Sequence, residues 1–208
     1  FSDDMSVDEI FAAATQAALG YLEAAGYTVE NGKVTAAPEG AKMTYEIIIG
    51  ADGSGDHPSF AILTDAKAAL ESIGFTLEIN DVTDSNIMWD ALNAGTAEMW
   101  AAAWQATVDP DMYQVYHSAS VKSNYYHIND ETLDQDIIDA HSSADQEYRK
   151  SVYKQCLDII LDWAVEVPIY QRQNCIIYSP ERVNADTFTK DVSTFYYWYK
   201  DIENIEMN

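Results

Sequence analysis

The apolar positions in the first half of the chain follow helical and strand periods in turn. Apolar residues from Ile10 to Leu22 recur at helical spacing, Ser6 and Glu9 can form a capping box before them, and Gly26 ends the helix. The patterns that follow predict a strand at 43–50, a helix at 58–74, a strand at 75–82, a short helix capped by Asp84 or Ser85, and an apolar strand that carries Trp100 and Trp104. Strands that alternate with helices at such short intervals are typical of a parallel or mixed sheet covered by helices.

The second half of the chain is predicted to be richer in helices. Asp109-Pro110 combines an acidic cap with a proline in the first turn, which favours a helix start there, and Asp130 and Asp145 begin two further helices. The apolar face expected for the last of these helices carries Tyr148, Val152, Cys156, Ile159 and Trp163. The apolar run at 167–178 predicts a strand, and the aromatic residues at 195–199 predict a surface that packs against a partner.

Composition narrows the classes of protein to which the chain can belong. The 208 residues are 48% hydrophobic, which is enough for one substantial core or two small ones. The formal charge of −24 argues against nucleic acid as a partner, because a phosphate backbone needs a basic surface. No run of about 18 apolar residues occurs, so no membrane-spanning helix is predicted. The opening Phe1-Ser2-Asp3-Asp4 has no signal-peptide character, and we expect the chain to be a piece of a longer protein.

The sequence contains no motif that indicates catalysis, a metal or a cofactor. Cys156 and Cys175 lie in apolar surroundings that predict buried, unreactive thiols. A disulfide between them is the alternative. The four histidines have no spacing typical of zinc and are expected in surface or capping roles. The 35 carboxylates are too many for a catalytic pair to be singled out. The residues therefore give an enzyme no positive support, and we predict no enzymatic activity. Two alternatives stay open beside any binding role: a hydrolase that uses two carboxylates, and a cell-surface module that contacts a partner through residues 195–199.

Aromatic residues mark the candidate binding region. They gather around the second and third strands and in the loops that follow: Trp89, Trp100, Trp104, Tyr113, Tyr116, Tyr125 and Tyr126. We expect Trp100 in the core and Trp104, nearest the loop, to face a ligand. An indole at the end of a strand, beside the N-terminus of a helix, offers a stacking surface and free backbone N–H groups to a small polar molecule. The alternative is a buried strand with an ordinary connection.

Four segments resemble the C-terminal half of extracytoplasmic solute-binding proteins of the peptide and nickel ABC-importer family. They are YLEAAGY at 21–27, ESIGFTLEI at 71–79, the Trp-loop-Asp-Pro stretch at 104–110 and LDWAVEVPIYQRQ at 161–173. The resemblance covers nearly all of the chain. It implies an α/β fold, with a mixed sheet flanked by helices, that forms one lobe of a type II periplasmic-binding-protein-like fold. Residues 1–175 would be the ligand-binding lobe, and residues 176–208 a return segment toward an N-terminal lobe outside the chain.

The resemblance also implies a ligand site. Family members often carry an acid where this chain has Thr107, and that acid pairs with the amino terminus of a bound peptide. Trp104 would provide stacking area, Thr107 a hydrogen bond, and Tyr125 or Tyr126 a second aromatic wall. Asp109 either replaces the missing acid or caps the following helix. A hydroxyl in place of a carboxylate favours a solute without a fixed cation, such as a sugar or a modified peptide.

For the whole protein, the resemblance implies transport without chemistry. The protein would capture an oligopeptide-like solute between two lobes and deliver it to ABC permease subunits, as a monomer and without a cofactor. It would be extracytoplasmic, at the cell surface or in the periplasm. It would reach the membrane only through a lipid anchor outside these residues.

Overall fold

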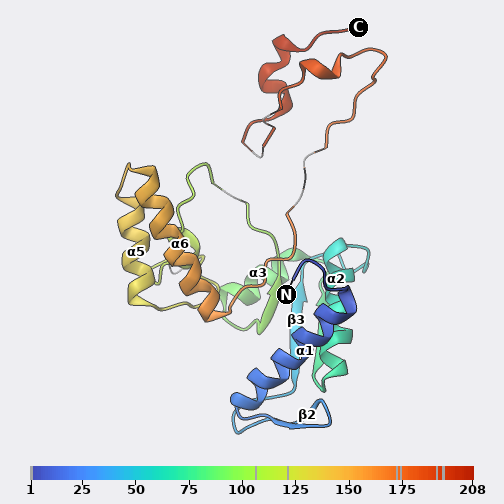
Figure 1. Cartoon of the computed structure of the whole chain (residues 1–208), viewed down its shortest axis with the longest axis vertical. Coiled ribbons are helices and arrows are strands. Elements are labelled where there is room, and N and C mark those ends of the chain that lie inside the picture. The colour runs from blue at the N-terminus through green and yellow to red at the C-terminus, as the bar shows by residue number, and fades with distance from the viewer. Residues whose placement is uncertain are drawn as a thin grey trace. The chain divides into compact units, whose positions relative to one another are not determined.

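The chain forms two compact units, residues 1–103 and residues 104–208, coloured from blue to green and from green to red in Figure 1. The computed structural model describes residues 2–105, 107–120, 122–171, 173, 175–190, 192–193 and 195–208. The first unit holds a β-sheet with its helices. The second holds a helical hairpin and a C-terminal segment of turns and short 3₁₀ helices.

The first unit is built on a parallel sheet. Its strands are β3 (Thr44–Ile49), β4 (Thr76–Asp81) and β5 (Met99–Ala101), in the spatial order β4-β3-β5. Ile47 of β3 pairs with Ile79 on one side and with Met99 on the other. The predicted α/β fold, with sheet flanked by helices, is therefore confirmed. The sheet itself is parallel and not mixed, because the antiparallel pairing of this unit belongs to a separate hairpin.

Local capping signals begin the helices of this unit where the sequence predicts them. The helices are α1 (Val7–Ala24), α2 (Pro58–Ser72) and α3 (Ser85–Asn93). In the capping box of α1, the Ser6 N–H donates to Glu9 Oε2 at 2.8 Å and the Glu9 N–H donates to Ser6 Oγ at 3.3 Å. Asp84 caps α3 by accepting from the Asn86 N–H at 2.9 Å, and the His57 ring caps α2. These bonds satisfy backbone N–H groups that a helix start leaves unpaired.

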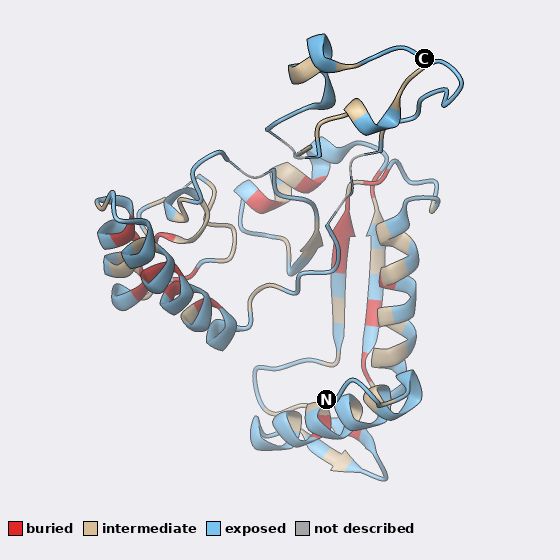
Figure 2. Ribbon diagram, turned by 45° about the horizontal axis from the view of Figure 1, so that its top comes forward, coloured by how far each residue is buried: buried red, intermediate tan, exposed pale blue. Residues whose placement is uncertain are grey.

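Two apolar clusters hold the first unit together. One joins the sheet to α2 and consists of Ile47, Ile49, Ala51, Leu63 and Leu77. The other joins α1, the hairpin and the end of α2, and consists of Leu19, Val34, Ile73 and Phe75. Figure 2 shows buried residues, in red, along the sheet strands. Burial of these side chains is the main favourable contribution to the stability of the unit.

A β-hairpin is the element of this unit that periodicity misses. It consists of β1 (Thr28–Glu30) and β2 (Lys33–Ala36). Its turn residues Asn31 and Gly32 have φ values of 51° and 76°, as a two-residue type I′ turn requires. Strands of three and four residues are too short to show an alternating pattern.

The second unit is organised by two long helices. They are α5 (Glu131–His141) and α6 (Gln146–Trp163), which run side by side in Figure 1, and the short α4 (Tyr113–Tyr116) precedes them. Asp130 and Asp145 cap α5 and α6 as predicted, accepting from the N–H groups of Thr132 at 2.9 Å and Glu147 at 3.0 Å. The core of this hairpin, red in Figure 2, consists of Ile128, Leu133, Ile137, Ala140, Val152, Tyr153, Cys156 and Ile160.

Several predictions for the second unit are corrected by the structure. The helix expected at Asp109 begins at Tyr113, because the Asp109 carboxylate pairs with Arg149 and Asp111 accepts from the Tyr113 N–H instead. The described residues of 167–178 form no strand, although the run is apolar. The apolar composition of a segment predicts that it is suited to a strand, but it does not show whether another strand lies beside it to pair with.

The buried face of α6 is also rotated from the one predicted. Val152 and Cys156 are buried as expected, whereas Tyr148 and Trp163 are 44% and 41% exposed. Tyr153 and Ile160 are buried in their place. A helix that packs against a single neighbour buries a narrower stripe than its apolar residues suggest.

The two cysteines differ in environment, which leads to a testable prediction. Both thiols are free; Cys156 is buried as predicted, whereas Cys175 is exposed and not buried. Burial, aided by the charge of Asp136, raises the pKa of Cys156 to about 11. We expect Ellman's reagent at pH 8 to modify Cys175 rapidly and Cys156 only after unfolding. The variant Cys175→Ser should lose the fast phase, and a fast phase that persists in it would contradict this description of α6.

Candidate functional site

An exposed indole and two tyrosines form the centre of the candidate site. Trp104 is 40% exposed, and its Nε1–H donates to Tyr126 Oη at 2.8 Å. The indole also stacks on Tyr125, with ring centroids 6.2 Å apart and an interplanar angle of 17°. Trp104 lies beyond the end of β5, and Trp100, which was expected in the core, is only half-buried. The structure therefore brings together three of the residues that the sequence predicts for the site.

The core of the helical hairpin holds part of this aromatic group in place. Tyr126 stacks on Tyr116 with centroids 5.6 Å apart and planes 7° apart, and Tyr116 Oη donates to Glu166 Oε2 at 2.7 Å. Both tyrosines pack on the hairpin core. Burial raises the pKa of both phenols well above the usual range, so they stay neutral at physiological pH. Trp104, Tyr116, Tyr125 and Tyr126 are called the aromatic cluster below.

Thr107 and Asp109 contact each other in the loop that follows Trp104. The Thr107 hydroxyl donates to the backbone carbonyl of Asp109. The Asp109 carboxylate accepts from Arg149 Nη2 at 2.6 Å, and this hydrogen bond holds the pKa of Asp109 below its usual range. Asp109 is thus neither the cap of a helix nor an unpaired acid.

Sequence reasoning missed Arg149 and Glu166 as parts of this region. Arg149 lies 40 residues from Asp109 in the chain, and Glu166 lies 50 residues from Tyr116. The scarcity of cations was the available signal, because the chain has 11 Lys and Arg against 35 Asp and Glu. An arginine in the first turn of a predicted helix, amid such an excess of acids, is expected to form an ion pair, but the sequence does not identify the partner.

His117 is the C-cap residue of α4, which fits the predicted capping role, but unlike a surface residue it is buried. It is 7% exposed, its ring lies tilted against that of Tyr113 with centroids 4.3 Å apart, and its Nδ1 accepts from the Ala119 N–H at 3.0 Å. Asp134 beside it accepts from the Ser118 N–H at 2.8 Å. These bonds brace the chain between α4 and α5. In the described part of the chain, no group of three or more His, Cys, Asp or Glu side chains is arranged to hold a metal ion.

Solved structures of solute-binding proteins share this fold. The oligopeptide-binding protein AppA from Bacillus subtilis, in complex with a nonapeptide, is similar with a TM-score of 0.61 and 20% identity, over 79% of this chain and 32% of that one. NikZ from Campylobacter jejuni, in complex with Ni(L-His), gives 0.57 and 18%, over 73% and 30%. NikA from Brucella suis, in complex with Fe(III)-EDTA, gives 0.57 and 20%, over 79% and 34%. The chain has the fold of peptide and nickel solute-binding proteins.

The chain matches only part of each of these solute-binding proteins. The chain spans about a third of the length of the structures it matches. No protein-family model matches the sequence, and no curated protein matches it. Among the residues that the structure describes, no helix has the length and apolar character needed to cross a membrane.

Proposed function

We propose that the chain is one lobe of an extracytoplasmic solute-binding protein of the peptide and nickel ABC-importer family. The protein captures an oligopeptide-like solute between two lobes and delivers it to the permease without chemical change. The observation that carries the proposal is the 40% exposed indole of Trp104, which stacks on Tyr125 and donates to Tyr126, a residue packed on the core of the helical hairpin. A preorganised aromatic surface loses little conformational freedom when a solute stacks on it.

Hinge closure is the proposed mechanism. A solute that contacts both lobes stabilises the closed form, and the population shifts only by the difference in affinity between the open and closed forms. In this lobe, Trp104 and one of the two tyrosines provide apolar contact. Thr107 and Asp109, in the loop that follows Trp104, provide polar groups. The second lobe supplies the opposite wall.

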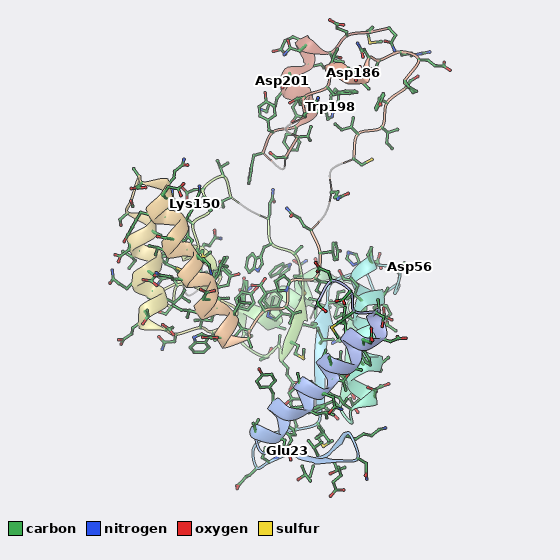
Figure 3. All side chains as sticks on the ribbon, viewed as in Figure 1. Glu23, Asp56, Lys150, Asp186, Trp198 and Asp201 are labelled. Atoms are coloured by element: carbon green, nitrogen blue, oxygen red, sulfur yellow. The ribbon has the colours of Figure 1, made fainter. Side chains whose placement is uncertain are left out.

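Residues 1–175 form the proposed ligand-binding lobe, and residues 176–208 return toward the second lobe. The side chains of Phe195, Tyr196, Tyr197, Trp198 and Tyr199 are each 38–48% exposed. The same segment, in which Figure 3 labels Trp198 and Asp201, holds an apolar pocket of about 390 Å³ lined by residues such as Phe188 and Ile202. So much exposed apolar surface favours a covering partner. The second lobe is that partner in this proposal, and the whole protein is a monomer with a lipid anchor outside these residues.

Binding without turnover is the result that tests the function. The longer protein that carries both lobes is titrated with tripeptides to nonapeptides, and the same mixtures are analysed by mass spectrometry. Saturable binding is expected, with every peptide recovered intact. Cleavage that a single Asp or Glu substitution abolishes would support the hydrolase alternative. Absence of binding, together with capture of a protein partner that requires residues 195–199, would support the cell-surface module.

A further inference from the structure

The ion pair between Asp109 and Arg149 is unequal in its exposure to water. The Asp109 side chain is in a loop and is 57% exposed, whereas the Arg149 side chain, in the first turn of α6, is 20% exposed. If the pair opens, the Asp109 carboxylate can be hydrated at little cost. The guanidinium has less access to water, and it would remain as a largely buried, unpaired charge. Arg149 therefore needs an anionic partner more than Asp109 needs a cationic one.

Arg149 also keeps a hydrogen-bond donor unused. Its Nε is buried and has no hydrogen-bond partner among the described residues. Its Nη2 is shared between Asp109 Oδ1 at 2.6 Å and Tyr153 Oη at 3.4 Å. Nε–H and Nη2–H lie on one edge of the guanidinium, and that edge matches the two oxygens of a carboxylate. Asp109 occupies only half of this edge.

Tyr153 holds the Arg149 guanidinium against the same hairpin core that supports the aromatic cluster. The Arg149 Cζ lies 5.6 Å from the centroid of the Tyr153 ring, which is buried in the hairpin core. Tyr116 and Tyr126 pack on that core as well. The guanidinium and the stacking surface therefore belong to one compact unit and one apolar cluster.

Two further acids of this region, Asp111 and Glu166, already have partners. Asp111 Oδ2 lies 3.4 Å from His141 Nδ1, and Glu166 accepts from Tyr116. A solute ammonium would have to displace Arg149 from Asp109 and leave the guanidinium unpaired. A solute carboxylate would have to displace only the exposed Asp109. The overall charge of −24 opposes an approaching anion, but at 0.1 M salt it is screened beyond about 10 Å, so the local guanidinium decides.

We propose that Arg149 binds a carboxylate of the solute on its Nε–Nη2 edge, and that Asp109 is the counter-ion which the solute replaces. This inference rests on the proposed function and narrows the solute to an oligopeptide-like acid without an ammonium group at this position. Arg149 thereby becomes a specificity-determining residue of the site. Asp109 takes no direct part in holding the solute.

Three forms of one tripeptide test the charge preference on the longer protein by calorimetry. They are N-acetyl-Ala-Phe-Ala with a free carboxylate, Ala-Phe-Ala amide with a free ammonium, and N-acetyl-Ala-Phe-Ala amide without charge. The acid form is expected to bind at least about tenfold more tightly than the neutral form, and the ammonium form no more tightly than the neutral one. Equal affinities, or tightest binding of the ammonium form, would overturn the inference and leave the proposed function standing. No binding of any form would contradict the peptide-like solute, and with it both.

Matched variants separate Arg149 from the general effect of charge. Lys150, labelled in Figure 3, is 69% exposed and pairs with Glu147 at 2.7 Å. Arg149→Gln and Lys150→Gln change the net charge equally. Arg149→Gln is expected to abolish the preference for the acid form, whereas Lys150→Gln changes it by less than about twofold, because an exposed charge is screened. Similar losses in both variants would overturn the inference.

Asp109→Asn provides an independent test if Arg149→Gln is too unstable to measure. Removing the competing carboxylate is expected to tighten binding of the acid form severalfold and to leave the ammonium form unchanged. Unchanged or weaker binding of the acid form would overturn the inference. Loss of ammonium-form binding would show that Asp109 pairs directly with the solute, which also overturns it.

Discussion

Replacing Trp104 with alanine is expected to weaken solute binding by the longer protein about 30-fold or more, since an anchoring tryptophan contributes on the order of 2 kcal/mol. The substitution removes a 40% exposed indole together with its stacking on Tyr125 and its hydrogen bond to Tyr126. Trp104→Phe keeps a ring but not the N–H, and should retain most of the affinity. Calorimetry with the peptide that binds best measures both variants.

Trp163 provides the control for this prediction. Its indole is 41% exposed, in the same unit, and donates to the Asp130 carboxylate at 3.3 Å. Trp163→Ala removes an equally exposed indole that is not part of the aromatic cluster, so affinity should stay unchanged. If Trp163→Ala and Trp104→Ala weaken binding equally, the aromatic cluster is not the site.

Gly74→Ala is expected to destabilise the first unit by about 3 kcal/mol or more, because it adds backbone strain to a steric clash. Gly74 has φ of 101°, and a Cβ at this position would lie 2.3 Å from the backbone oxygen of Val34 in β2. The hairpin cannot move away freely, because the Val34 N–H donates to the Ile73 carbonyl at 2.8 Å. Urea unfolding followed by circular dichroism measures the free energy of unfolding.

Gly20→Ala is the matched control for Gly74→Ala. Gly20 lies inside α1, and a Cβ there meets no atom within 4 Å. The substitution should raise the free energy of unfolding by about 0.5–1 kcal/mol, because alanine loses less conformational entropy than glycine in a helix. A Gly74→Ala protein as stable as the Gly20→Ala protein would refute the close approach of β2 to the end of α2.

The starts of four helices were predictable because their signals are local. Ser6, Asp84, Asp130 and Asp145 each cap a helix through hydrogen bonds to residues two or three positions away. The strands β3 and β4 were predictable for a similar reason, since the β-branched residues of β3 and the alternation in β4 are visible without reference to a partner strand. The parallel fold follows from the alternation of these strands with helices.

The missed features depend on contacts between residues distant in the chain. Asp109 has the sequence environment of a cap, but an ion pair with Arg149 takes its carboxylate. The apolar run at 167–178 has the sequence pattern of a strand, yet its described residues form none. Trp104 was predicted as a ligand residue from its place before a loop. Its contact with Tyr126, 22 residues away, comes from the fold and not from any local pattern.

The most direct test of the two-lobe account compares the 208-residue chain with the longer protein in the same calorimetric titration, using the peptide that binds best. A solute enclosed between two lobes loses the contacts of one wall in the isolated chain. We therefore predict affinity at least about 100-fold weaker for the chain alone, equivalent to about 2.7 kcal/mol. Equal, tight affinity of the two proteins would contradict capture between two lobes.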